Sequence, residues 1–138
     1  MTEQTATATA LAVSHASWAC VRAHDRAGWL ALMADDVLIE DPIGVAVTNP
    51  DGLGVRGKEA AGAFYDANIA PNSLTFDREE TFESSDPAEV AHVLSIRTDF
   101  GNGTAARIRG LFTYRVDDAG LLTNLRGYWN LEGMRFES

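Results

Sequence analysis

Several features that would define a protein class are scarce in this 138-residue chain. A single cysteine, Cys20, excludes a disulfide framework and a cysteine-based metal site. No apolar run approaches the roughly 18 residues that a membrane span requires. Residues 1–9 lack both a basic start and an apolar stretch, so we expect a disordered tail there instead of a signal peptide. The cytoplasm is therefore the expected location.

Basic residues are also few, because 11 Lys and Arg stand against 20 Asp and Glu and the net charge is −9. This acidic excess argues against nucleic acid or an anionic membrane surface as a partner. The histidines, His15, His24 and His92, are scattered without the spacing of a metal site. We expect no metal and no cofactor, and a neutral or apolar small molecule as the ligand.

Helical periodicity opens the single domain that we expect over residues 10–138. Apolar residues recur at three- and four-residue steps over residues 10–24, and Asp25 can cap a second short helix that packs Trp29 inward. A third helix is expected over residues 58–69, because Pro71 bars its continuation.

The second half of the chain is typical of strands joined by turns. Strands are expected over residues 74–82, 89–100, 107–116 and 121–131, with Gly101-Asn102-Gly103 as a hairpin turn. Helices first and hairpin-linked strands afterwards predict an α+β fold. We expect one curved, cone-shaped antiparallel sheet, with the three helices of the N-terminal half packed on its concave face.

The most informative segment surrounds Asp41. Val37, Ile39 and Asp41 share one side of a strand expected over residues 37–41, so the carboxylate points where apolar side chains point. A desolvated carboxylate has a raised pKa and is a usable proton acceptor near neutral pH. The alternative is that the strand has already ended and Asp41 only opens the turn made by Pro42 and Gly44. The spacing leaves both interpretations open.

The chain resembles the bacterial Δ5-3-ketosteroid isomerases and SnoaL-like proteins of the cone-shaped nuclear-transport-factor-2-like superfamily. The matching residues are Ala34-Asp35-Asp36, Glu40-Asp41-Pro42, Gly44, Gly57, Phe64-Tyr65, Asp117-Asp118-Ala119-Gly120 and Tyr128-Trp129. The resemblance implies a steroid Δ-isomerase in which Asp41 is the general base that shifts a proton α to a ketone, with Trp129 beside it. It implies a pocket for a steroid-like molecule lined by Ser17, Val21, Met33, Phe64, Phe112, Leu125, Gly127 and Trp129.

Two positions depart from the isomerase pattern. Without gaps, Ser17 falls where these isomerases carry an oxyanion-hole tyrosine, and Phe112 falls where they carry a neutral aspartic acid. Losing one such donor commonly costs on the order of a hundred- to a thousandfold in rate. Tyr65 is a candidate replacement donor, and the alternative is a tyrosine half-buried against the sheet.

Asp99 is a second candidate donor, and two expectations conflict there. Alternation along residues 89–100 puts Asp99 beside Arg97 on the polar face, whereas the family register turns both toward the cavity. An ion pair costs little at a surface and much in a dry pocket, so we expect this pair at the cavity rim. Arg97, Asp99 and Asp41 could also mimic the Asp-Arg-Asp set of epoxide hydrolases on this scaffold.

Two functions from different classes therefore stay open. The first is the isomerase, and the second is a domain that binds a steroid or another small apolar ligand without turning it over. A hydrogen-bond donor within reach of the ligand ketone separates the two. We also expect a homodimer through the convex sheet face, on which the following residues would lie: Arg109, Asn124, Arg126 and Tyr128.

Overall fold

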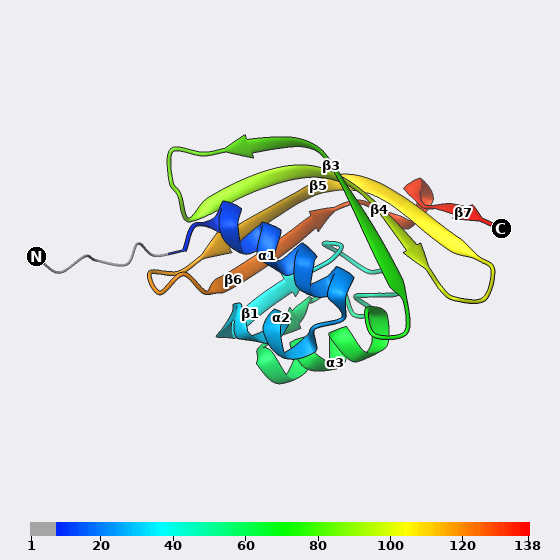
Figure 1. Cartoon of the computed structure of the whole chain (residues 1–138), viewed down its shortest axis with the longest axis horizontal. Coiled ribbons are helices and arrows are strands. Elements are labelled where there is room, and N and C mark those ends of the chain that lie inside the picture. Colours follow the sequence, from blue (N-terminus) through cyan, green and yellow to red (C-terminus); the bar gives the residue numbers. More distant parts are fainter. Residues whose placement is uncertain (1–7) are drawn as a thin grey trace, which may run out of the picture.

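The structure is a computed structural model that describes residues 8–138. Most of the tail expected over residues 1–9 lies outside the described residues. Thr9, however, is the N-cap of the first helix, because its side chain accepts a hydrogen bond from the Ala12 amide at 3.1 Å. The described part contains three helices and a curved, mostly antiparallel sheet of seven strands, which confirms the predicted α+β fold (Figure 1).

The helices are α1 (Ala10–Ala23), α2 (Arg26–Ala31) and α3 (Lys58–Asn68), all close to the predicted ranges. Asp25 caps α2 as expected, since its carboxylate accepts a hydrogen bond from the Gly28 amide at 2.9 Å. The strands are β1 (Met33–Glu40), β2 (Val55–Arg56), β3 (Ser73–Glu83), β4 (Glu89–Asp99), β5 (Ala105–Val116), β6 (Leu122–Tyr128) and β7 (Arg135–Glu137). Their order across the sheet is β2-β1-β6-β5-β4-β3, and β7 pairs with β5.

The sheet departs from the sequence expectation at several points. β1 begins at Met33 instead of residue 37, and it ends at Glu40, one residue before Asp41. β1 and β6 pair in parallel, with Ile39 opposite Leu125, although the pattern predicts only antiparallel neighbours. β6 stops at Tyr128, and a short 3-10 turn, η1 (Leu131–Gly133), separates it from β7. The short strands β2 and β7 escape prediction because two or three residues carry no readable alternation.

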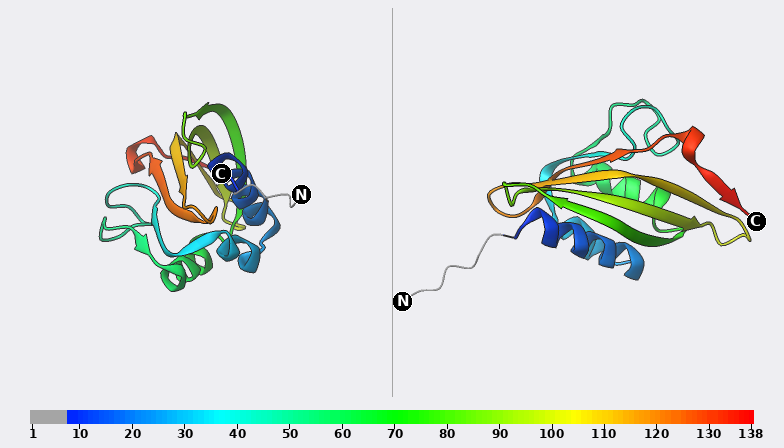
Figure 2. Two further views of the ribbon diagram at one scale, coloured as in Figure 1. Left: turned by 90° about the vertical axis from the view of Figure 1, so that its left-hand side faces the viewer. Right: turned by 90° about the horizontal axis from the view of Figure 1, so that it is seen from above.

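The core lies on the concave side of the sheet. α1 crosses this side over β3, β4 and β5, while α3 packs on β1 and α2 joins the two helices (Figure 2). His92 of β4 is fully buried there, and its ring makes hydrogen bonds with the Ser14 hydroxyl of α1 at 2.9 Å and the Thr81 hydroxyl of β3 at 2.8 Å. These bonds hold α1 against the sheet. Within residues 8–138, no helix is both long and apolar enough to cross a membrane.

Candidate active site

A cavity of about 550 Å³ opens between the concave face of the sheet and the helices. Its wall is mostly apolar, and the strands and the helices all contribute side chains to it. The wall includes the following predicted site residues: Ser17, Val21, Asp41, Phe64, Phe112, Leu125 and Trp129. Residues from distant parts of the chain thus meet around one hollow.

Asp41 is the acidic group in this wall. The Trp129 indole N–H donates a hydrogen bond to Asp41 Oδ1 at 2.7 Å, and the two residues are 88 positions apart. Burial raises the pKa of the Asp41 carboxyl above its ordinary value, and the hydrogen bond from Trp129 offsets part of that rise. The desolvated carboxyl with one fixed donor is suited to accept a proton from a ligand.

Both interpretations of Asp41, as a residue on the apolar face of the strand and as the start of a turn, are partly correct. The strand has ended at Glu40, so Asp41 does open the following bend. Its side chain still continues the apolar face, because Val37 and Ile39, at two-residue spacing before it, are buried in the core. The residue therefore has the backbone of a turn and the side-chain direction of the strand.

Polar contacts from the loop before β2 and from β6 hold the backbone at and just after Asp41. The Thr48 hydroxyl donates to the Asp41 carbonyl. The Asn49 amide donates to the Pro42 carbonyl at 2.9 Å, and Asn49 is only 2% exposed. The Ile43 amide donates to the carbonyl of Gly127 in β6 at 3.0 Å. Together these bonds fix the backbone that carries the base.

Gly127 lies directly beside the base, although it does not itself line the cavity. A Cβ at this position would stand 2.9 Å from the Phe112 ring, 3.0 Å from Asp41 Oδ1 and 3.1 Å from Trp129 Nε1. All three distances are tighter than ordinary contacts of a methyl group. The missing side chain leaves the space in which the carboxylate and the indole meet.

Two predicted residues lie elsewhere. Met33 is 1% exposed and belongs to the core instead of the cavity wall. Tyr65 is 2% exposed, packs against Trp29 with ring centroids 5.4 Å apart, and does not line the cavity. Its buried hydroxyl has no hydrogen-bond partner among the described residues. The structure thus gives no support to Tyr65 as a donor to the ligand.

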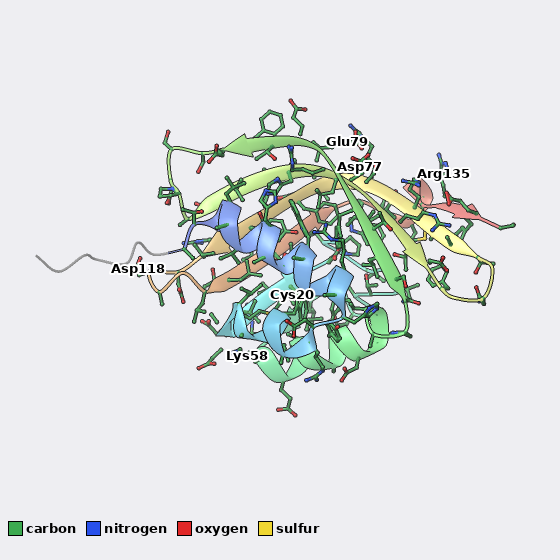
Figure 3. The ribbon with its side chains drawn as sticks, in the orientation of Figure 1. Cys20, Lys58, Asp77, Glu79, Asp118 and Arg135 are labelled. Atoms are coloured by element: carbon green, nitrogen blue, oxygen red, sulfur yellow. The ribbon has the colours of Figure 1, made fainter. Side chains whose placement is uncertain are left out.

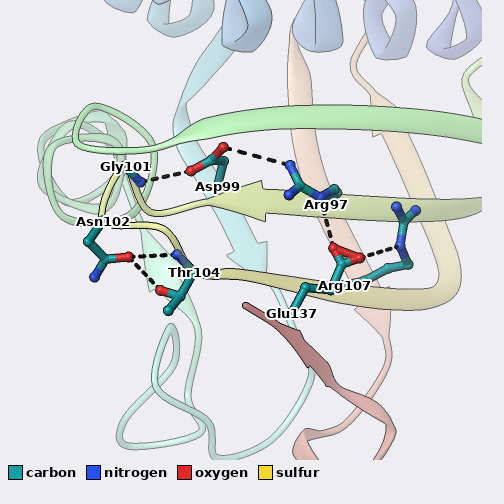
Figure 4. Close-up of polar contacts among 7 residues, drawn as sticks. All are labelled: Arg97, Asp99, Gly101, Asn102, Thr104, Arg107 and Glu137. Carbon is teal, nitrogen blue, oxygen red and sulfur yellow. Dashed lines mark hydrogen bonds and ion pairs between the residues drawn. The ribbon is translucent and has the colours of Figure 1, made fainter.

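Arg97 and Asp99, expected at the cavity rim, are not among the residues that line the cavity. Arg97 forms two ion pairs (Figure 4). Its Nε lies 2.9 Å from Oε2 of Glu137 in β7, and its Nη1 lies 3.7 Å from Oδ2 of Asp99. Their neighbours on the other face of β4, Ile96 and Thr98, line the cavity. Alternation along β4 therefore predicted the outer face correctly, and the family register did not. An epoxide-hydrolase set of Asp41, Arg97 and Asp99 is not assembled.

The outer face continues in the same way along β3 and β5. Glu79 of β3 points away from α1 (Figure 3), accepts a hydrogen bond from Ser95 at 2.6 Å and pairs with Arg109 at 3.0 Å. Among residues 8–138, no group of three or more His, Cys, Asp or Glu side chains is placed to hold a metal ion.

The site residues predicted from the sequence do not include Tyr114 and Trp18. Both line the cavity, and the Trp18 indole N–H donates to the Tyr114 hydroxyl at 2.8 Å. The signal for Tyr114 was available, because strand alternation places it on the same face as Phe112. A tyrosine that alternates with apolar residues is typical of the core, and nothing in the sequence indicates that the Tyr114 hydroxyl meets a residue 96 positions away.

Comparisons with known proteins agree with this geometry. A family profile described as "SnoaL-like domain" matches residues 15–125. The crystal structure of RV0760c from Mycobacterium tuberculosis is 62% identical, covers 97% of this chain and 100% of that chain, and superposes with a TM-score of 0.92. The same protein in complex with estradiol-17beta-hemisuccinate is 63% identical over 91% of this chain and 97% of that chain, with a TM-score of 0.89.

A second similar structure is that of a Δ5-3-ketosteroid isomerase from Mycobacterium sp. It is 62% identical, covers 93% of this chain and 98% of that chain, and has a TM-score of 0.91. A search of curated proteins finds no match. The profile match and the identity over nearly the whole chain agree with the resemblance read from Asp41 and its neighbours, and the protein therefore belongs to the SnoaL-like domain family of the nuclear-transport-factor-2-like superfamily.

Proposed function

We propose that this protein binds a steroid-like ketone in its cavity and moves a carbon–carbon double bond into conjugation with the ketone. The observation that carries the proposal is the Asp41 carboxyl, which is desolvated in an apolar cavity and held by the Trp129 indole at 2.7 Å. The high identity to a Δ5-3-ketosteroid isomerase and to a protein solved with an estradiol derivative supports a steroid as the ligand class.

The reaction needs only one residue to carry the proton. The Asp41 carboxylate removes a proton from the carbon between the ketone and the double bond, and the C–H electron pair moves into a dienolate whose negative charge rests on oxygen. The resulting carboxylic acid returns the proton to the far carbon of the dienolate. The carboxylate is regenerated, and the product is the conjugated enone.

The shape and chemistry of the cavity suit this ligand class. Pockets that bury a drug-sized molecule have volumes of about 300–1,000 Å³, and the cavity here has about 550 Å³. Apolar side chains such as Ile96, Ile108 and Leu125 offer contact to a rigid hydrocarbon skeleton. The raised pKa of Asp41 brings the carboxyl closer to the acidity of the proton that it has to take.

Binding without turnover is the second candidate function. The observation that favours it is the presence of Ser17 and Phe112 in the cavity wall, where isomerases of the family carry their oxyanion donors. A dienolate without a donor forms slowly, whereas an apolar cavity binds a steroid without one. In that case Asp41 meets a polar group of the ligand and does no chemistry.

The variant Asp41→Asn separates the two functions. It keeps the size of the side chain and an oxygen that accepts from Trp129, but it removes the basic group. We expect turnover of 5-androstene-3,17-dione, followed by the absorbance of the conjugated product, to fall about 10²–10⁴-fold. Calorimetry should show steroid affinity within a few-fold of the wild type. Wild-type turnover that survives in the variant would show that another residue is the base, and wild-type binding without turnover would favour the carrier.

We also propose a homodimer formed through the convex face of the sheet. This face carries Arg109, whose side chain is 65% exposed, and Tyr128, which is 49% exposed. Arg126 lies next to Tyr128, with its guanidinium 5.7 Å from the ring centroid, and pairs with Glu40 at 3.1 Å. A broad surface with an aromatic side chain and arginines is typical of protein interfaces.

A further inference from the structure

Tyr114 brings a hydroxyl into the part of the cavity that holds the base. It follows Phe112 by two positions in β5, so both side chains project from the same face, and both line the cavity. In the sheet, Phe112 lies opposite Gly127 and Tyr114 lies opposite Leu125. Gly127 is next to Asp41, so this register puts the Tyr114 ring two residues along β5 from the position that faces the base. The charge of Asp41 is near enough to contribute to the raised pKa of Tyr114, after the larger effect of burial.

The proton of Tyr114 can be located from its neighbours. An indole nitrogen only donates, so the Tyr114 oxygen accepts the Trp18 N–H at 2.8 Å and its own proton points elsewhere. Ser17 is the other polar side chain that interacts with Tyr114. Ser17 gives its single proton to the Ser14 carbonyl at 2.7 Å, so that proton is already engaged. The Tyr114 O–H is thus left to donate to an acceptor on the cavity side, since Tyr114 and Ser17 both line the cavity.

The other polar groups in the wall are less suited to meet a ketone beside Asp41. The Thr48 hydroxyl donates to the Asp41 carbonyl. Thr98 lies opposite Ala106 of β5, which is eight residues from Tyr114 and so about 26 Å away along the strand. Asn72 precedes Ser73, which lies opposite Asp99, and so belongs to the same distant end of the sheet. The Asn68 amide donates to the Phe64 carbonyl at 3.2 Å, and the Asn68 carbonyl accepts from the Asn72 amide at 2.8 Å. Tyr114 is the donor that the fold places near the base.

We propose that Tyr114 donates a hydrogen bond to the ketone oxygen of the bound ligand and that Trp18 positions it for this role. The proposal rests on the function proposed above and identifies the donor that Ser17 and Phe112 do not supply. Donation from Trp18 into the Tyr114 oxygen polarises the phenol and strengthens the bond that it donates. The same bond would stabilise the dienolate oxygen once Asp41 has removed the proton.

The test uses testosterone labelled with ¹³C at its only ketone and follows the carbonyl stretch by infrared difference spectroscopy. On the wild-type protein the band should lie at lower frequency than in an apolar solvent, because a donated hydrogen bond weakens the C=O bond. Tyr114→Phe should return the band toward its apolar-solvent position and weaken binding about three- to tenfold, the effect of one hydrogen bond. Trp18→Phe keeps an aromatic ring and Tyr114 but loses the N–H, and should give an intermediate shift.

Tyr65→Phe is the matched control, because it removes a buried hydroxyl that does not line the cavity. It should leave the carbonyl band unchanged. If testosterone binds and Tyr114→Phe leaves the band where the wild type has it, the Tyr114 assignment is wrong while the proposed function stands. If the wild type does not bind testosterone at all, the proposed function fails and the donor role falls with it.

Discussion

At the scale of single residues, the ionisation of Asp41 sets the pH dependence of the proposed reaction. Burial raises its pKa and the Trp129 hydrogen bond lowers it. Only the carboxylate form acts as a base, so kcat/KM for the Δ5 steroid should fall as the pH is lowered through this raised pKa. Trp129→Phe removes the bond that lowers the pKa, so the fall should move to higher pH. A pH–rate profile of both proteins checks this, and a shift to lower pH in the variant would contradict it.

A second prediction at this scale concerns Gly127, which lies beside the base. Its absent side chain leaves room for Asp41 and Trp129, so Gly127→Ala should push the carboxylate away from the indole. A misplacement of about 1 Å commonly costs on the order of a hundredfold in rate, and we expect a loss of that size in the isomerase assay.

Gly133→Ala is the control for Gly127→Ala, because its new Cβ would be 3.5 Å from its nearest neighbour, the Asn130 side chain, which is an ordinary contact. Thermal unfolding of both variants shows whether each is folded. Full activity in a folded Gly127→Ala protein would mean that the base tolerates displacement.

At the scale of elements, His92 links α1 to β3 and β4 and makes their packing sensitive to acid. Burial, with smaller effects from His15 and Arg78, lowers the pKa of His92 from 6.5 to about 4. Between these values the unfolded chain binds the proton and the folded chain does not, so stability is present above pH 6.5 and is lost as the pH falls toward 4. The slope from this one group is at most about 1.4 kcal/mol per pH unit.

Urea unfolding between pH 4.5 and 7 measures that slope. His92→Gln can still make hydrogen bonds but does not titrate, so its free energy of unfolding should depend less on pH than that of the wild type. His24→Gln serves as the comparison, because His24 is exposed and its ring bonds to the Asn72 carbonyl, outside the buried network of His92. Equal slopes in the wild type and His92→Gln would exclude His92 as the titrating group.

Element by element, sequence patterns predicted the helices well and the sheet in part. The caps at Asp25 and the break before Pro71 are local signals, and the structure has helices in those places. Strand faces were also predictable, since Ile108, Phe112 and Tyr114 alternate onto the cavity side. The parallel pairing of β1 with β6 was not, because alternation describes one strand and not the direction of its neighbour.

At the scale of the whole molecule, the homodimer through the convex face of the sheet is a prediction that sedimentation can test. We expect sedimentation at micromolar concentration to give twice the mass of the chain. The double variant Arg109→Glu/Arg126→Glu changes the charge of the convex face and should shift the equilibrium toward monomer, because like charges repel at a symmetric interface. Lys58→Glu, at the start of α3, is the control and should remain dimeric. A wild-type protein that sediments as a monomer would contradict the dimer.

What the sequence determined by itself is the character of each surface. Periodicity and turn residues specified that Asp41 follows an apolar face, that Phe112 and Tyr114 face the interior, and that the chain forms an α+β fold. Only the tertiary structure decided which of these groups meet, because contacts such as Trp129 with Asp41 and Trp18 with Tyr114 join residues about ninety positions apart. Local patterns encode which side of an element is buried, whereas the register between distant elements depends on the packing of the whole core.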